Sequence, residues 1–392
     1  MSIAVGDAVA LARELVRVDS RNPALVPGAR GEAEVAAVLA AVLESWGFAV
    51  ELRDAAPGRP NVIARIGGTG GGRSLMLNGH LDTVGIDGMT HDAFDPVIRD
   101  GRLHGRGACD MKSGVAAMCA AAARAARTGL AGEVIVAAVI DEELESLGTR
   151  ALLEQGVRAD AAIVTEPTRL SVMPAHRGFV WMELRVTGRA AHGSRYDMGV
   201  DAIRHAALVL AELDRLDAEV LPHRTHPLLG RGSLHASTIT GGTAWSIYPD
   251  SCTVTVERRT LPGESADDAV AELRAACARV NDRLQRSGRS LEYDVARQFS
   301  QAGSEISVDA PIVRALSRSL ESAGAPVRVE GASYWTDMAL LNEAGIPSIC
   351  YGPGDIALAH GAEEWIEVSQ VEQAADVIER LITTWCGAQG AS

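Results

Sequence analysis

The sequence predicts an α/β protein with a mostly parallel central sheet, into which a smaller α+β domain of ferredoxin-like type is inserted. Up to about residue 175, short apolar runs alternate with helical patterns, as in parallel sheets covered by helices. Between about residues 177 and 296 the order becomes β-α-β-β-α-β, which is typical of a ferredoxin-like sandwich. The first pattern returns after residue 310. We therefore expect one discontinuous domain, residues 1–177 and 298–392, around an inserted domain, residues 178–297.

The first third of the chain contains the elements of the expected α/β layer. Strands are expected where short apolar runs occur, at residues 49–53, 62–66, 74–77, 133–140 and 161–164. Helices are expected where apolar residues recur at helical spacing, at residues 5–18, 31–46, 113–128 and 149–155. The GGTGGG run at residues 67–72 joins two strands with no helix after it. We interpret it as a hairpin-like connection and not as a dinucleotide-binding loop.

The inserted and returning segments continue the same kind of pattern. In the inserted domain we expect strands at residues 180–186, 234–240, 252–258 and 291–295, and helices at residues 200–214 and 265–285. In the returning segment we expect helices at residues 311–323 and 371–384 around a strand at residues 348–351. A chain of 392 residues exceeds one comfortable hydrophobic core, so a division into two domains is natural.

Composition narrows the classes of function. The chain carries 51 acidic and 37 basic side chains, a net charge of −14, which disfavours nucleic acid and anionic membranes as partners. No segment is apolar enough to cross a bilayer, and the amino terminus resembles an amphipathic helix more than a signal peptide. The six cysteines are scattered without a CxxC pair. This usage favours reduced thiols, and we expect a cytoplasmic protein.

Acidic and imidazole side chains follow the ends of the expected strands or lie in loops. They are His80 and Asp82 in LMLNGHLDTV, Asp110 in GRGACDMKSG, Glu142 and Glu143 in DEELESLG, Glu166 in VTEPT, and His360 in ALAHGAEEW. Each has an ordinary alternative by itself: a strand-end histidine is often structural, adjacent glutamates are often solvated, and Asp110 could cap the next helix. Because the carboxyl ends of parallel strands share one edge of a sheet, we expect the set to converge.

The residue types in this set predict a pair of divalent cations. Two imidazoles and three carboxylates without cysteine suit metals bound through nitrogen and oxygen, with zinc as the first choice and cobalt or manganese as alternatives. A bridging carboxylate would hold two ions about 3.5–4 Å apart, and Asp110 is the candidate bridge. His80 and Glu166 would complete one site; Glu143 and His360 would complete the other.

Two further carboxylates fit supporting roles beside these metals. Asp82 is placed to accept a hydrogen bond from the second ring nitrogen of His80, which would orient the imidazole. Glu142 is adjacent to the candidate ligand Glu143, but its side chain is expected to be directed elsewhere. It is therefore available to take a proton from an activated water and to deliver it to the leaving amine.

These motifs, in this order, resemble the acetylornithine deacetylase and succinyl-diaminopimelate desuccinylase family, which also includes aminoacylases and glutamate carboxypeptidases. The resemblance runs through NGHLDTV, DGRLHGRGACDMKSG, DEELESLG, VTEPT, GRAAHGS, RRTLPGE, GIPSICYGPG and AHGAEEW. It implies a zinc-peptidase-like catalytic domain with the roles given above, a lid domain that dimerises, and a cis peptide bond after Asp110.

The resemblance also implies roles for residues of the lid domain. His192 in AAHGS resembles the histidine that reaches into the partner subunit's active site to stabilise an oxyanion, with a plain surface histidine as the alternative. Arg259 in RRTLPGE resembles the arginine that grips a substrate carboxylate, and Arg258 is the alternative because neighbours on a strand face opposite ways.

The sequence departs from the family pattern at two places. Ser246 in GGTAWSIYP replaces an asparagine that helps many relatives to hold the substrate carboxylate, and Thr90 and His91 stand where a tryptophan is frequent. Both departures affect the expected identity of the substrate and leave the metal site intact.

The expected function is a dinuclear metal-dependent amidohydrolase that removes the acyl group from an N-acyl amino acid. A metallo-exopeptidase acting on short peptides uses the same residues and is the alternative. A non-catalytic binding relative is less favoured because no ligand or base is missing, and a serine hydrolase is disfavoured because no GxSxG motif occurs.

Overall fold

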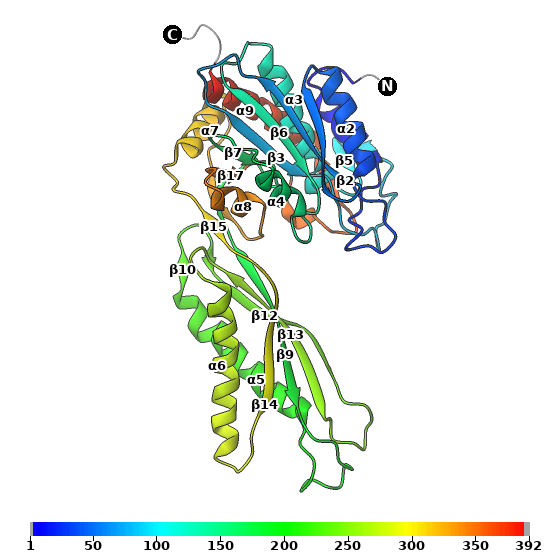
Figure 1. Cartoon of the computed structure of the whole chain (residues 1–392), viewed down its shortest axis with the longest axis vertical. Helices are drawn as coiled ribbons and strands as arrows, with labels where there is room; N and C mark the ends of the chain where they lie inside the picture. Colours follow the sequence, from blue (N-terminus) through cyan, green and yellow to red (C-terminus); the bar gives the residue numbers. More distant parts are fainter. Residues whose placement is uncertain (1–2, 388–392) are drawn as a thin grey trace. The chain divides into compact units, whose positions relative to one another are not determined.

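The computed structural model describes residues 3–387, and the chain divides into two compact units (Figure 1). The first unit comprises Met1–Pro174, Ile306–Glu330 and Thr336–Ser392; the second comprises Ala175–Glu305 and Gly331–Trp335. The second unit is therefore an insertion in the first, with one short later segment added. Among the described residues, no helix has the length and apolarity needed to cross a membrane.

The centre of the first unit is formed by a nine-stranded sheet in the order β1-β2-β6-β3-β7-β17-β8-β15, with β16 paired to β8; β15 and the last residues of β8 and β16 are assigned to the second unit. Its strands are β1 (Ala49–Ala56), β2 (Arg59–Gly67), β3 (Leu75–His80), β6 (Glu133–Val139), β7 (Ala162–Val164), β8 (Val172–His176), β15 (Ser304–Glu305), β16 (Val329–Ala332) and β17 (Ser348–Cys350). The four neighbours β6, β3, β7 and β17 are parallel, which confirms the predicted parallel centre. Antiparallel strands flank them on both sides.

The glycine-rich run at residues 67–72 does not form the expected hairpin. β2 and β3 lie on opposite sides of β6, with β2 antiparallel and β3 parallel to it. The strand β6 is buried along nearly its whole length. Such an apolar strand is stable in the middle of a sheet, between two neighbours, and not at an edge. Instead of turning back, the loop runs beside the segment that leads into β6, where Gly68 N donates to Gly132 O at 3.1 Å and Gly70 N to Ala131 O at 2.9 Å.

Helices cover the sheet of the first unit. They are α1 (Ala8–Arg17), α2 (Ala33–Ser45), α3 (Ser113–Ala126), α4 (Leu147–Glu154), α7 (Pro311–Ser322), α8 (Met338–Glu343) and α9 (Val368–Cys386). The alanine-rich helix α3 is buried around almost its whole circumference and contacts both α1 and α9. Small side chains permit this close packing of backbones, which explains how a chain with few aromatic residues fills its core.

Three short strands connect distant parts of the first unit. β4 (Ile98–Arg99), β5 (Arg102–His104) and β18 (Trp365–Glu367) form a small sheet in the order β18-β5-β4. β5 directly precedes the segment of Asp110, and β18 follows the segment of His360. This pairing therefore joins two parts of the chain that carry expected metal ligands.

The second unit is a four-stranded antiparallel sheet in the order β12-β13-β9-β14 with two helices. Its main elements are β9 (Gly178–Thr187), α5 (Ala202–Arg215), β12 (Ser233–Gly241), β13 (Ser251–Thr260), α6 (Ala266–Gln285) and β14 (Glu292–Gln301). Side chains of β13 alternate between buried and less buried positions, as expected for a sheet with one face covered by helices. The order and the helix positions confirm the predicted ferredoxin-like topology.

Candidate metal centre

Several of the expected metal-ligand residues lie at the carboxyl ends of the parallel strands, at one edge of the central sheet. His80 is the last residue of β3 and pairs in register with Val139 at the end of β6. Glu142 and Glu143 therefore follow just beyond β6, and Glu166 follows just beyond β7. The strand β7 neighbours β3 (Figure 1). The convergence predicted from strand order is present in the fold.

The donors form two groups that share Asp110. Each group places one ligand atom per residue within 4.8 Å of the others; the groups are His80, Asp110 and Glu166, and Asp110, Glu143 and His360. Asp110 Oδ1 lies 3.1 Å from His80 Nε2, and Asp110 Oδ2 lies 3.4 Å from His360 Nε2. The two oxygens of one carboxylate thus face different groups, which is the arrangement of a bridging ligand.

The remaining distances complete both groups. His80 Nε2 lies 3.9 Å from Glu166 Oε1, and His360 Nε2 lies 3.0 Å from Glu143 Oε2. The peptide bond between Asp110 and Met111 is cis, as the family resemblance implied. All five donors belong to the first unit, so the cluster is complete within one compact body.

The electrostatics of the cluster reflect crowded carboxylates. Burial and the neighbouring Asp110 raise the pKa of Glu166 well above its usual value and raise the pKa of Glu143. Burial also opposes ionisation of Asp110, but hydrogen bonds from His360 and His80 outweigh it and hold the pKa of that carboxyl below its usual value. Hydrogen bonds to Asp110 and Glu143 raise the pKa of His360 to about 10. The cluster therefore attracts positive charge.

The residues present fit divalent cations. Oε1 of Glu166 is buried and has no hydrogen-bond partner among residues 3–387, although such an oxygen is costly to leave unsatisfied. The donors are exclusively imidazole nitrogens and carboxylate oxygens, the set that zinc and similar metals accept. A cation at each group would satisfy the orphaned oxygen and reduce the repulsion between the carboxylates.

Asp82 supports the cluster in more ways than the sequence indicated. Nδ1 of His80 lies 3.0 Å from the backbone oxygen of Asp82 and 3.5 Å from its Oδ1, so the residue faces the second ring nitrogen with two oxygens. Its carboxylate also accepts the backbone N–H groups of Glu142 at 3.2 Å and Glu143 at 3.3 Å. Asp82 therefore orients both a ligand ring and the turn that carries the two glutamates.

Glu142 belongs to neither ligand group. Burial and the nearby Glu166 carboxylate raise its pKa well above the usual value. A carboxyl with a raised pKa holds and releases protons nearer to neutral pH than an exposed one does. Its position beside the ligands and its electrostatics both suit proton transfer.

Sequence reasoning missed the residues that hold this turn from behind. Asn22 Nδ2 donates to Asp82 Oδ2 at 2.9 Å and to Asp141 Oδ1 at 3.0 Å. Arg59 Nη2 donates to Asn22 Oδ1 and to Asp141 Oδ1, each at 3.2 Å, and pairs with the buried Glu32. An asparagine before a proline is a common turn sequence, so no local signal distinguishes Asn22 as part of the site.

The expected lid residues His192 and Ser246 lie close together in the second unit. His192 is exposed, and its Nδ1 lies 2.9 Å from Ser194 Oγ. The next residue, Gly193, donates its backbone N–H to Ser246 O at 2.7 Å. The loops that carry the two residues are therefore joined by the backbone.

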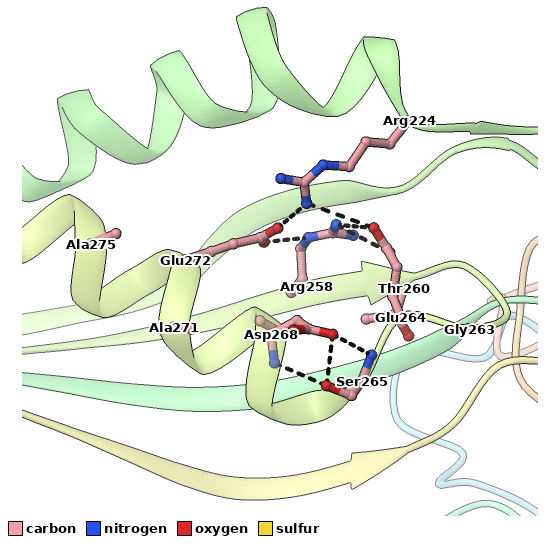
Figure 2. A pocket seen from close by; sticks show the side chains of 11 residues that line it. Arg224, Arg258, Thr260, Gly263, Glu264, Ser265, Asp268, Ala271, Glu272 and Ala275 are labelled. Carbon is pink, nitrogen blue, oxygen red and sulfur yellow. Dashed lines mark hydrogen bonds and ion pairs between the residues drawn. The ribbon is translucent and has the colours of Figure 1, made fainter.

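Arg258 and Arg259 point to opposite faces of β13, and their surroundings differ. The side chain of Arg258 is 2% exposed and pairs with Glu264 at 3.0 Å and Glu272 at 3.1 Å; Figure 2 shows it enclosed in this network, which Arg224 also joins. Arg259 is 30% exposed, pairs with Glu257 at 2.6 Å, and stands 5.3 Å from the centre of the Phe179 ring. Arg258 is thus committed to structural ion pairs, whereas Arg259 remains accessible.

Comparison with known proteins identifies the family of the chain. The sequence matches the model of "Peptidase family M20/M25/M40" over residues 76–384. It is 33% identical to acetylornithine deacetylase of Myxococcus xanthus over 357 residues, which cover 88% of this chain and 90% of that protein. It is also 29% identical to N-formyl-4-amino-5-aminomethyl-2-methylpyrimidine deformylase of Bacillus subtilis, with 92% and 91% covered.

The fold is similar to that of solved structures as well. A crystal structure of a tripeptidase from Staphylococcus aureus superimposes with a TM-score of 0.80 at 19% identity, covering 98% of this chain and all of that one. The family match spans most of the chain and includes all five candidate ligand positions. The chain therefore belongs to peptidase family M20/M25/M40, and it is a hydrolase of amide bonds.

Proposed function

We propose that the protein is a dinuclear metal-dependent amidohydrolase that cleaves the amide bond of an N-acyl amino acid and releases the free amine. The observation that carries this proposal is the carboxylate of Asp110, which presents one oxygen to each of two three-residue ligand groups. The names of two relatives support the deacylase reading, because an acetylornithine deacetylase and a deformylase both remove a small acyl group.

Five residues would hold the two ions: His80, Asp110 and Glu166 one, and Asp110, Glu143 and His360 the other. Zinc suits this donor set best, and cobalt or manganese are alternatives. When bound, such a pair supplies Lewis acidity that polarises the amide carbonyl and acidifies water.

The chain's own residues supply the proton transfer. Glu142 is positioned by the bond from its backbone N–H to Asp82, and its raised pKa suits a group that takes a proton from water and passes it to the leaving nitrogen. Asp82 keeps the His80 ring oriented through the contacts at Nδ1. A fixed ring presents Nε2 toward the metal site without further ordering cost.

The second unit would contribute substrate binding. Arg259 offers a planar guanidinium, which suits a carboxylate on the substrate, and Ser246 would add a hydrogen bond. His192 would stabilise the developing oxyanion in the active site of a partner subunit. This assignment makes the protein a homodimer through the lid domain.

Two features of the second unit support such a dimer. β12 lies at one end of its sheet and pairs on one side only within the described chain, and open strand edges are templates for pairing with another chain. Large apolar side chains are exposed on the neighbouring loops, among them Tyr196, Trp245 and Ile247. Exposed apolar side chains of this size mark interaction surfaces when they gather.

The proposal is tested by a substrate screen. Acetyl, succinyl, formyl and carbamoyl amino acids are offered to the zinc- and cobalt-loaded protein, and the free amine is measured. A metallo-exopeptidase, which the name of the family favours, would instead release a terminal amino acid from a dipeptide panel. A protein that binds no zinc, cobalt or manganese would contradict both and support a non-catalytic role.

A further inference from the structure

The carboxylate of Glu364 accepts four hydrogen bonds in the interior of the first unit. Its Oε1 accepts the backbone N–H groups of Cys109 at 2.8 Å and Asp110 at 3.0 Å. Its Oε2 accepts the backbone N–H of Gly107 at 3.1 Å and Nη1 of Arg106 at 2.7 Å. The residue is fully buried. One side chain thus satisfies three backbone donors of the segment that carries the bridging aspartate.

Strand pairing explains why Glu364 reaches this segment. In the β18–β5 pair, Trp365 lies opposite His104, and the backbone N–H of Gly105 donates to Glu364 O at 3.2 Å. The register places Glu364 beside the chain just where it leaves β5 toward Asp110. His360 precedes Glu364 by one short loop, so the same pairing brings both ligand segments together.

Arg106 closes the connection from the other side. Besides Glu364, its guanidinium donates to Gly361 O at 3.4 Å and to Gly85 O at 2.9 Å. Gly361 directly follows His360 in the chain. Both members of the Arg106–Glu364 pair are buried, where such a pair is weakly screened and tolerates little displacement.

We propose that Glu364 is a positioning residue for the metal pair: it holds the backbone of Asp110 against the loop that carries His360 and so sets the separation of these two ligands. The inference rests on the proposed dinuclear site and concerns a residue that belongs to neither ligand group. Metal affinity depends on ligand positions, and residues that orient ligands typically change it by about 10–100-fold when mutated.

The two ligand groups would depend on Glu364 to different extents. Asp110 belongs to both groups, whereas His360 belongs only to the group with Glu143. Loss of the Glu364 contacts frees the segments of Asp110 and His360, which are two ligands of the group with Glu143. In the group with His80 it frees only Asp110. The ion held by Asp110, Glu143 and His360 is therefore the more sensitive one.

The experiment measures metal binding to the folded, full-length protein. Metal-free wild type and Glu364→Gln are titrated with Co²⁺ by calorimetry, at a temperature where circular dichroism shows both fully folded. Each carboxylate oxygen of Glu364 accepts two hydrogen bonds, and an amide nitrogen accepts none, so the variant loses two of the four bonds in either orientation of its amide. We expect two binding steps in the wild type and a loss of about 10–100-fold in affinity at one step in the variant, with a smaller loss at the other.

Two controls separate positioning from stability. Leu316→Ala removes a fully buried side chain of α7 and destabilises the fold, but it should leave both binding steps unchanged. Glu367→Gln removes a carboxylate of the same segment that pairs with the exposed Arg102, and the variant should bind metal as the wild type does. If Glu364→Gln does not fold, Arg106→Lys tests the same connection, because it removes the planar contacts to Gly361 and Gly85; a weaker step is expected there too.

Three results would overturn the inference. Wild-type affinity at both steps in the folded Glu364→Gln or Arg106→Lys variant would show that the contacts do not set ligand positions. An equal loss of affinity in Leu316→Ala would show that stability alone explains the effect. A wild-type protein that takes up no divalent ion would overturn the proposed function together with this inference, whereas the first two results leave that function standing.

Discussion

The carboxylate of Asp82 accepts the backbone N–H of Glu142 at 3.2 Å, across 60 residues of sequence. The adjacent N–H, that of Glu143, meets the same carboxylate at 3.3 Å. Both glutamates are thus held by their backbones, and each side chain is left to its own task. Only Glu143 belongs to a ligand group, so mutation can separate the two tasks.

Substitution of the two glutamates should have different effects on metal content. Glu142→Ala should retain both metals and lose about 10²–10⁴-fold in turnover, because it removes proton transfer and not a ligand. Glu143→Ala should lose one metal, because it leaves His360 and Asp110 as the only ligands of that group. Metal content by elemental analysis, together with turnover of the best substrate from the screen, distinguishes the two. Equal metal loss in both variants would show that the assignment within the pair is wrong.

Asn22 should prove sensitive to a change of a single atom. Asn22→Asp places a third carboxylate against Asp82 and Asp141, which Asn22 now contacts at 2.9 and 3.0 Å as a donor. Loss of two buried donor bonds and the added repulsion should lower the free energy of unfolding by roughly 1–3 kcal/mol or more and reduce turnover. Denaturant unfolding and activity assays measure both.

The matched control is Asn281→Asp in the second unit. Asn281 Oδ1 accepts the backbone N–H of Leu291 at 3.0 Å, and an aspartate keeps that acceptor. This variant should retain stability and turnover. If Asn22→Asp behaved like Asn281→Asp, the network behind the turn would have no part in positioning the glutamates.

The neighbouring arginines of β13 should differ in what they affect. Arg258→Met leaves Glu264 and Glu272 without their buried partner and should destabilise the fold by roughly 3–5 kcal/mol. Arg259→Met should leave the melting temperature nearly unchanged and lower kcat/KM for carboxylate-bearing substrates by roughly 10- to 100-fold, mostly through KM. Unchanged kinetics in Arg259→Met, with a neutral substrate analogue as the reference, would remove Arg259 from the substrate site.

His176 should make the metal-free protein less stable in mild acid. Burial lowers the pKa of His176 from 6.5 to about 4, although a hydrogen bond to Arg177 O opposes the shift. Between these values the unfolded chain binds the extra proton and the folded chain does not, so stability is present above about pH 6.5 and is lost as the pH falls toward 4. From pH 7 to pH 5 the loss that His176 alone contributes should be roughly 2 kcal/mol. The raised pKa values of Glu143 and Glu166 act in the opposite direction, so the contribution of His176 is the difference between the wild type and a variant that lacks it.

Urea unfolding at the two pH values measures this loss, with His176→Phe as the comparison. Phenylalanine keeps a ring beside Trp335, whose ring centre lies 6.0 Å from that of His176, but it does not titrate. The variant should therefore lose less stability than the wild type over the same interval. An identical pH dependence in both proteins would show that His176 titrates normally in the folded state.

Mixing two inactive variants tests the proposed shared site. His192→Ala and Glu142→Ala should each have low activity, and a mixture that exchanges subunits should recover about a quarter of the wild-type rate. In the mixed dimer one site combines an intact Glu142 with the partner's intact His192. A fully active protein that remains monomeric by sedimentation would contradict both the dimer and the role of His192.

Local patterns were sufficient for element types and for much of the chemistry. Apolar periodicity predicted a helix at residues 113–128, and α3 spans Ser113–Ala126; the β-α-β-β-α-β order predicted the topology of the second unit. Pairing of distant strands was not predictable in the same way. The glycine-rich run was expected to join neighbours, yet β6 lies between the strands that it connects, because the partner of a strand is chosen by burial and not by the length of the loop.

By itself, the sequence determined which donor atoms the protein carries, that they follow strand ends, and that Asp110 can be shared between two groups. Only the tertiary structure decided that Asn22 holds the turn of the two glutamates, that Arg258 is buried in ion pairs, and that Glu364 accepts the backbone N–H of Asp110. Helix and strand periodicities act over a few neighbouring residues. The bond between Arg106 and Glu364 joins residues 258 positions apart, and such partners meet only after the sheet and the β18–β5 pair have formed.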